Sequence, residues 1–145
     1  REGDLWAGVK ELKILAEEFP KSELAGQGLL KVAEFLVSQG KSDEAKSELM
    51  KIINNSTAGS SNRTFAEKKL AEILRAQGHL REAAFYFSEA LKGAPSDLAC
   101  EINFELAEVY ETQGETPPRY LRTLQAVRHG DDYVRATFEW VATQA

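Results

Sequence analysis

Apolar residues recur at spacings of three and four along most of the chain, with polar residues between them. The stretches LKILAEEF, from Leu12, and LLKVAEFL, from Leu29, show this pattern. It places apolar side chains on one face of an α-helix, whereas no alternation of strand length and no Asn-Gly or Asp-Gly hairpin signal occurs. The chain is therefore predicted to be all-α, with helices near Asp4–Phe19, Glu23–Gln39, Asp43–Asn54, Phe65–Gln77, Leu80–Lys92, Asp97–Gln113, Pro117–His129 and Tyr133–Thr143.

Helix-start signals refine several of these boundaries. Ser42 and Ser96 each precede an aspartate, which puts a capping hydroxyl and a first-turn acid at two helix starts. Thr64 and Glu67 have the spacing of a capping box, which predicts that a helix begins at Phe65. The polar stretch Asn54–Arg63 is predicted to be the one real loop.

Four glycines fall at nearly even intervals. Gly3, Gly40, Gly78 and Gly114 are separated by 37, 38 and 36 residues, and each is predicted to follow one helix and precede the next. A fixed period of this size with two helices per unit is typical of a helical solenoid. Each glycine is expected to adopt the left-handed conformation at a helix end, where a side chain would clash.

Other positions keep the same register relative to these glycines. A small residue five positions after the glycine is predicted to let two helices approach closely, and an alanine recurs seven positions before it. The shared positions are Gly8, Ala45 and Ala83; Ala33, Ala71 and Ala107; Leu15, Ile52, Ala90 and Ala126; and Pro20 and Pro95. So many common offsets indicate a repeated unit rather than unrelated hairpins.

This unit resembles the tetratricopeptide repeat, a helical hairpin with a small residue, glycine and aromatic signature and a closing proline. The best match carries Ala71, Leu74, Gly78, Ala83, Phe87, Ala90 and Pro95 where the family has its pattern. The resemblance implies a right-handed superhelical solenoid of antiparallel hairpins. We expect one domain over 1–145, with a half repeat at 3–20, repeats at about 22–57, 64–95 and 96–130, and a capping helix at about 132–144. The third repeat departs from the pattern at Arg119 and Thr123.

In this family the first helix of each hairpin lines a concave groove, so the resemblance implies a site for a segment of another protein. The implied lining residues are Gln27, Leu30, Glu34, Val37, Phe65, Lys68, Glu72, Arg75, Glu101, Phe104, Glu108 and Glu111. Leu30 and Glu34 stand where many members carry two residues of a clamp for a peptide carboxylate, which argues against such a clamp here.

The acids of the third unit indicate an apolar partner segment that carries Lys or Arg. Two alternatives stay open for these charges. They form a solvated face without a ligand, or the acids face the basic residues of the preceding unit, Lys68, Lys69 and Arg75.

Charge and composition narrow the classes of function. The chain has 145 residues and a net charge of -5, which disfavours nucleic-acid binding because that requires a basic face. No apolar stretch approaches the ~18–20 residues of a membrane-spanning helix. His79 and Glu82 have no evident third metal ligand, and the single cysteine, Cys100, has no local base to activate it. We expect no metal, no cofactor and no catalysis.

Two functions fit these observations. The first is a protein-interaction module that binds a partner segment in its groove. The second is an architectural or homodimerisation segment of a longer solenoid, with no peptide ligand of its own. The chain opens on REGDLW without an initiator Met, so we expect a fragment or a mature form. The stretch FPKSELA at Phe19–Ala25 resembles a junction in tetratricopeptide proteins of the bacterial cell envelope, while a cytoplasmic location stays open.

Overall fold

The computed structural model of the chain describes residues 2–114, and these residues form six α-helices and no strands. The helices are α1 (Glu2–Glu18), α2 (Glu23–Ser38), α3 (Ser42–Asn55), α4 (Ser61–Ala76), α5 (Leu80–Leu91) and α6 (Ser96–Gln113). The helices predicted at 117–129 and 133–143, together with Arg119 and Thr123, lie outside the described residues.

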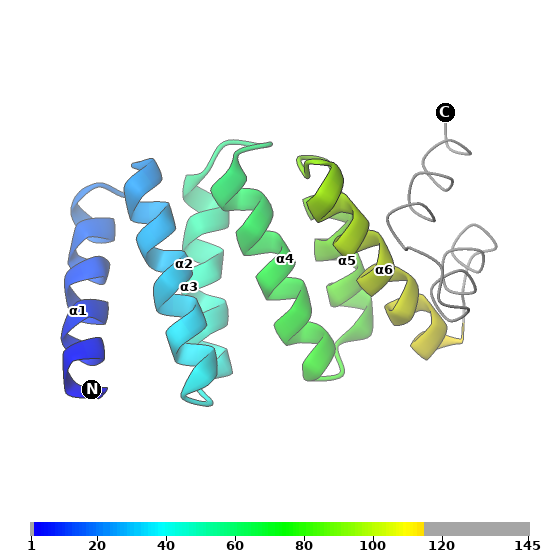
Figure 1. Cartoon of the computed structure of the whole chain (residues 1–145), viewed down its shortest axis with the longest axis horizontal. Helices are drawn as coiled ribbons and strands as arrows, with labels where there is room; N and C mark the ends of the chain where they lie inside the picture. The colour runs from blue at the N-terminus through cyan, green and yellow to red at the C-terminus, as the bar shows by residue number, and fades with distance from the viewer. Residues whose placement is uncertain (1, 115–145) are drawn as a thin grey trace.

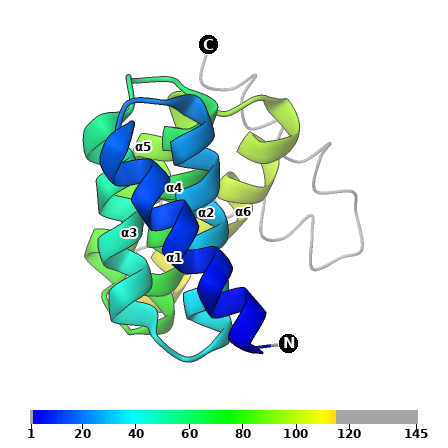
Figure 2. The ribbon, with the colours of Figure 1, turned by 90° about the vertical axis from the view of Figure 1, so that its left-hand side faces the viewer.

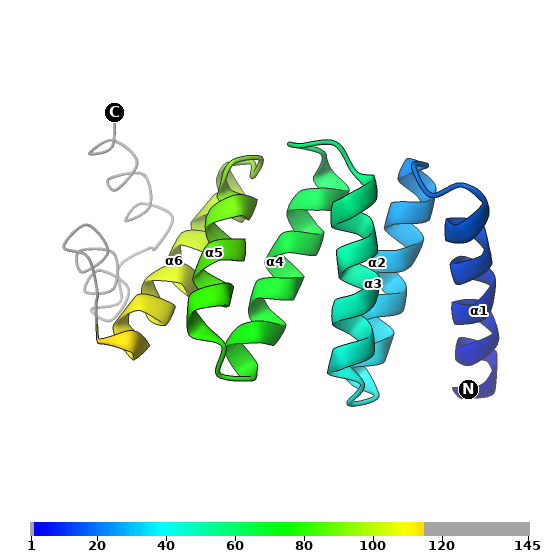
Figure 3. The same cartoon turned by 180° about the vertical axis from the view of Figure 1, so that it is seen from behind.

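The helices stack side by side, and most of them form two layers. One layer consists of α2, α4 and α6, and the other contains α3 and α5, as the two opposite views show (Figures 1 and 3). Helices α2 and α3 pack as one antiparallel hairpin, and α4 and α5 pack as the next. Helix α1 closes one end of the stack, where it lies across the front of Figure 2. The predicted fold class, an all-α solenoid of helical hairpins, is confirmed.

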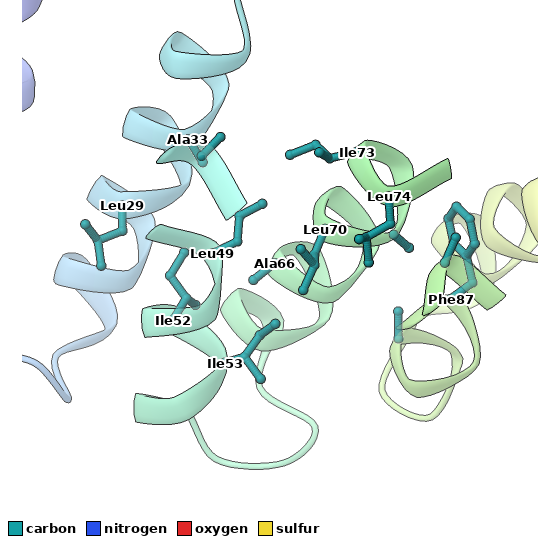
Figure 4. Close-up of a cluster of buried hydrophobic side chains, with 14 of the residues drawn as sticks. Leu29, Ala33, Leu49, Ile52, Ile53, Ala66, Leu70, Ile73, Leu74 and Phe87 are labelled. Carbon is teal, nitrogen blue, oxygen red and sulfur yellow. The ribbon is translucent and has the colours of Figure 1, made fainter. Parts of the chain in front are cut away.

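The core runs continuously along the stack between the two layers. Leu29 and Ala33 of α2 face Leu49 and Ile52 of α3, and α4 contributes the next row of apolar side chains (Figure 4). Its members Ala66, Leu70 and Leu74 lie between α3 and Phe87 of α5. Ala45 and Ala83 are each 0% exposed, which confirms their predicted burial. A larger side chain at either position would have no room in a core of this density.

The turns within the hairpins depend on glycine, as the sequence predicted. Gly40, Gly78 and Gly114 have φ angles of 76°, 84° and 75°, in the left-handed region that residues with a Cβ avoid. In the second hairpin the Gly78 amide donates to the Arg75 carbonyl at 3.0 Å, and the His79 amide donates to the Leu74 carbonyl at 2.9 Å. These bonds use carbonyls that the end of α4 leaves without helical partners.

The glycine series does not extend to the first helix. Gly3 lies inside α1 instead of ending a helix, so its predicted role in a turn is wrong. Gly8 was predicted to sit at a close helix contact, but it is exposed, and a Cβ built on it meets no atom within 4 Å. Both errors have one cause. Among the described residues no helix precedes α1, so Gly3 has no helix to end and Gly8 has no neighbouring helix to contact, although both keep the spacing of the repeat.

Helix α4 begins earlier than the sequence predicted. Its first residue is Ser61, and Ser60 caps it by accepting a hydrogen bond from the Arg63 amide at 3.3 Å. The proposed capping box of Thr64 and Glu67 is therefore wrong, and both residues lie buried inside the helix. The predicted loop shortens accordingly to 56–60.

The other two predicted caps are displaced by one residue. Helix α3 is preceded by Lys41 and α6 by Pro95, and neither start has a side-chain capping bond. Ser42 and Ser96 instead form the first residue of each helix. The predicted acids Asp43 and Asp97 do lie in the first turns, where a negative charge is favourable beside the helix dipole.

Candidate partner-binding surface

The layer formed by α2, α4 and α6 carries all twelve residues that were predicted to line the groove, and none of them is fully buried. Gln27, Glu34, Val37, Phe65 and Glu101 are exposed, while Leu30, Lys68, Glu72, Arg75, Phe104, Glu108 and Glu111 are half-buried. The structure brings two subsets of them together. Glu34, Val37 and Glu72 line one pocket between α2 and α4. Charged members on α4 and α6 form ion pairs across the gap between those helices.

The pocket, which we call the α2–α4 pocket, has a volume of about 420 Å³ and is lined by five apolar and five polar residues. Helix α2 contributes Ala33 and Val37, α3 contributes Leu49, and α4 contributes Ile73 and Ala76. Figure 4 shows Ala33, Leu49 and Ile73 facing the same region from three helices. The polar residues of its lining are Glu34, Ser42, Lys69, Glu72 and Gln77. Its size falls within the range of ligand-binding pockets, which is roughly 300–1,000 Å³.

Sequence reasoning identified only part of this pocket. Ala33 was recognised as a repeat position but not as part of a site. Leu49, Ile73 and Ala76 were not singled out as lining residues, although all three line the pocket. The available signal was the small residue at both Ala33 and Ala76, which leaves space between neighbouring helices.

The second subset is an ion-pair cluster around Lys68, which we call the Lys68 cluster. The Lys68 Nζ lies 2.9 Å from Glu72 Oε2, 3.3 Å from Glu105 Oε1 and 3.7 Å from Glu101 Oε2. One ammonium group therefore faces three carboxylates, two of them on α6 and one on its own helix. The cluster keeps a net negative charge when all four groups are ionised.

Two turns further along α4 from Lys68, Arg75 Nη2 lies 3.4 Å from Glu108 Oε1. Together with the Lys68 cluster, this pair shows that acids of α6 face bases of α4, which was one of the alternatives that the sequence left open. Lys69, the third candidate base, lines the α2–α4 pocket.

Burial and charge crowding shift the proton affinities in the Lys68 cluster. Burial raises the pKa of Glu105 to about 7, and the nearby Glu72 carboxylate adds to the rise while Lys68 opposes it. For Lys68, burial opposes the charged form, but Glu72 and Glu105 outweigh it and raise the pKa of the ammonium group. Lys68 therefore stays charged at neutral pH, while Glu105 is close to half protonated.

The residues that were considered as a metal ligand and as a nucleophile lie at a helix start and inside a helix. His79 precedes α5 as its cap residue, and Cys100 is buried within α6. Among residues 2–114 no group of three or more His, Cys, Asp or Glu side chains is arranged to hold a metal ion. Within the same part of the chain, every helix is too short or too polar to cross a bilayer.

Comparisons with known proteins identify the fold. No protein-family model matches the chain, and no curated protein matches its sequence. Among solved structures, the crystal structure of MamA is similar, with a TM-score of 0.62 over 99% of this chain and 92% of that chain, at 16% sequence identity. MamA is a tetratricopeptide-like helical protein, so the likeness supports a tetratricopeptide-like architecture for this chain. At this identity the likeness concerns the fold alone.

Proposed function

We propose that this chain is a protein-interaction module that binds a segment of another polypeptide along the surface of α2, α4 and α6, without catalysing a reaction. The α2–α4 pocket is the observation that carries the proposal, because it is a partly apolar hollow of about 420 Å³ beside the helices that the family resemblance implied would line the groove. The tetratricopeptide-like fold supports it, since the family uses this layer to hold partner segments. The resemblance at Phe19–Ala25 supports a bacterial cell-envelope setting as part of the same proposal.

The partner segment that fits this surface carries apolar side chains together with Lys or Arg. On the facing sides of α4 and α6, Lys68 and Arg75 meet four acids, namely Glu72, Glu101, Glu105 and Glu108. Glu34 adds a further carboxylate on α2. An acidic segment or a peptide C-terminus would meet repulsion here, because like charges across an interface are unfavourable.

A peptide array read at low and high salt tests this function. Peptides with apolar and basic residues should be retained in preference to acidic ones, and high salt should weaken them because exposed charges are screened over about 8–10 Å. The variant Glu34→Lys should reduce this binding. Its matched control is Glu82→Lys, which makes the same charge change at an exposed site on α5 in the opposite layer. Preferential capture of acidic peptides, or equal loss in both variants, would contradict the proposal.

The architectural function is the second candidate, and exposed apolar side chains on and beside α1 favour it. Leu5 and Phe19 are 52% and 57% exposed, and Ile14 is also exposed. Such a face is suited to packing against another protein surface. Light-scattering mass measured over a range of concentrations separates the two candidates. A monomer throughout favours the groove-binding module, whereas a dimer abolished by Leu5→Ser with Phe19→Ser favours the architectural one.

A further inference from the structure

The α2–α4 pocket has a counterpart one repeat later, where the same positions are filled differently. The repeat offsets of 38 and 36 residues pair Val37 with Arg75, and Glu72 with Glu108. In the later interface Arg75 and Glu108 form an ion pair at 3.4 Å, which bridges α4 and α6. In the earlier interface Val37 stands opposite Glu72 and has no charge to offer.

The residues at the base and edge of the two interfaces differ in size. Leu49 at the base of the α2–α4 pocket corresponds to Phe87 in the next repeat, a larger side chain that is fully buried. Ala76 at the pocket edge corresponds to Thr112. The earlier interface thus has Val37 in the place of Arg75 and smaller residues at two further lining positions. A hollow of about 420 Å³ lies between α2 and α4 in this earlier interface.

The side chains around the α2–α4 pocket suit an arginine side chain from outside the chain. An arginine side chain has an apolar stem and a planar charged head, so it can pack against hydrophobic residues while its head pairs with carboxylates. Val37, Ile73 and Ala76 offer the apolar wall, and Glu34 and Glu72 offer carboxylates on opposite sides. Val37 is 43% exposed, so the pocket can be entered from the surface.

We propose that the α2–α4 pocket is a subsite for an arginine side chain of the bound segment, which takes the place that Arg75 occupies one repeat later. The inference rests on the proposed function, because it names the residue that the partner segment inserts. The guanidinium head lies between Glu34 and Glu72, and the stem covers Ile73 and Ala76. Lysine fits less well, since its single ammonium head cannot bond two carboxylates through a flat fork.

Lys69 is the one base in the pocket lining, and it opposes an incoming cation. The two acids of the lining, Glu34 and Glu72, outnumber it. Glu72 also pairs with Lys68 at 2.9 Å, but the Lys68 cluster is itself net negative when its four groups are ionised, so the charge around the pocket favours arginine. This arrangement gives the proposal a specific consequence. Removing the charge with Lys69→Gln should strengthen arginine binding by about threefold, a size typical of one screened charge pair near a protein surface.

The test uses N-acetyl-arginine N-methylamide as a probe, followed by amide chemical shifts of the protein. Its matched control is the citrulline analogue, which has the same shape and no charge. Saturable shifts at Val37, Ile73 and Ala76, weaker by roughly tenfold for the citrulline probe, are expected because a bidentate charged pair is lost. Equal shifts with both probes, or shifts confined to other residues, would overturn the proposal.

Two variants test whether the probe occupies the α2–α4 pocket. Val37→Arg should place an arginine of the chain itself beside Glu72 and abolish probe binding, and Ala76→Leu should block the same pocket without adding charge. Both positions are exposed, so melting curves should show that each variant folds. Parent-like probe binding in both folded variants would overturn the proposal.

Different results would refute the proposed function and the arginine subsite. If arrayed peptides bind whether or not they contain arginine, and Val37→Arg leaves that binding intact, the subsite is wrong while the interaction module stands. If the arginine probe binds the pocket but no arrayed peptide is retained, the subsite stands and the interaction module is wrong.

Discussion

The ammonium group of Lys68 on α4 lies 3.3 Å from the carboxylate of Glu105 on α6, within a cluster where Glu72 and Glu101 compete for the same cation. The contact joins the first helices of two successive hairpins across the proposed binding surface. Because one base serves three acids, the cluster stabilises the stack less as more of its carboxylates ionise. Its contribution to stability therefore depends on pH.

The first prediction concerns Glu105→Gln. The pKa of Glu105 is raised from 4.5 to about 7 in the folded chain, so the folded state binds this proton more tightly than the unfolded state does. The stabilisation is fully present below pH 4.5 and is lost as pH rises through 7, an effect on the order of 3 kcal/mol. Glutamine mimics the protonated form at every pH. The variant should therefore melt at a higher temperature than the parent at pH 8, and at nearly the same temperature at pH 4.5.

Glu101→Gln is the matched control for that measurement. It lies on the same helix and beside the same lysine, but its side chain is 53% exposed. Its melting temperature should track the parent across the whole pH range. If the parent and Glu105→Gln curves run parallel from pH 4.5 to 8, the raised proton affinity of Glu105 is excluded.

The second prediction concerns the glycine that ends α4. Because Gly78 has a φ angle of 84°, Gly78→Val should lower the free energy of unfolding by at least about 1–2 kcal/mol, and Gly78→Asn should cost less. Gly8→Ala provides the contrast. Gly8 is helical and exposed with no neighbour within 4 Å, so alanine there should add about 0.5–1 kcal/mol. Urea denaturation measures all three, and equal small effects at Gly78 would mean that the turn has another geometry.

The third prediction concerns packing within the second hairpin. Ala83 is fully buried where α5 meets its neighbours, so Ala83→Leu should overpack the core and cost about 1–3 kcal/mol. Ala76→Leu makes the same chemical change at an exposed position and should have little effect on stability. Urea denaturation of both variants gives the comparison. A change near zero for Ala83→Leu would contradict the repeat register.

The repeat architecture could be predicted from the sequence because its signals are local or strictly periodic. A left-handed turn at Gly40 or Gly78 requires glycine whatever surrounds it, and Ala45 and Ala83 stand at one fixed distance from those turns. The start of α4 was missed because Ser60 and Thr64 are both good capping residues. The choice between them depends on the tertiary burial of Thr64, which a local motif does not report.

The candidate site was predictable only as a face. The resemblance to the tetratricopeptide repeat implied which residues share a surface, and all twelve lie on α2, α4 and α6. The α2–α4 pocket was not predicted because it depends on the space that Ala33, Leu49 and Ile73 leave between three helices. The protonation of Glu105 likewise depends on burial and on Glu72, a residue 33 positions earlier in the chain.

The last prediction measures how much the interface ion pair contributes where the chain supplies its own arginine. Arg75 and Glu108 are each about one-third exposed, so solvent screens their attraction. A double-mutant cycle with Arg75→Met and Glu108→Gln should give a coupling free energy of about 0.2–1 kcal/mol, as for other partly exposed pairs. The same cycle built with Val37→Arg and Glu72→Gln should give a value of similar size, because the repeat places these two positions in the same relation. No coupling in the second cycle, beside clear coupling in the first, would show that the two interfaces differ in geometry as well as in side chains. An arginine from a partner would then lack the template that Arg75 provides.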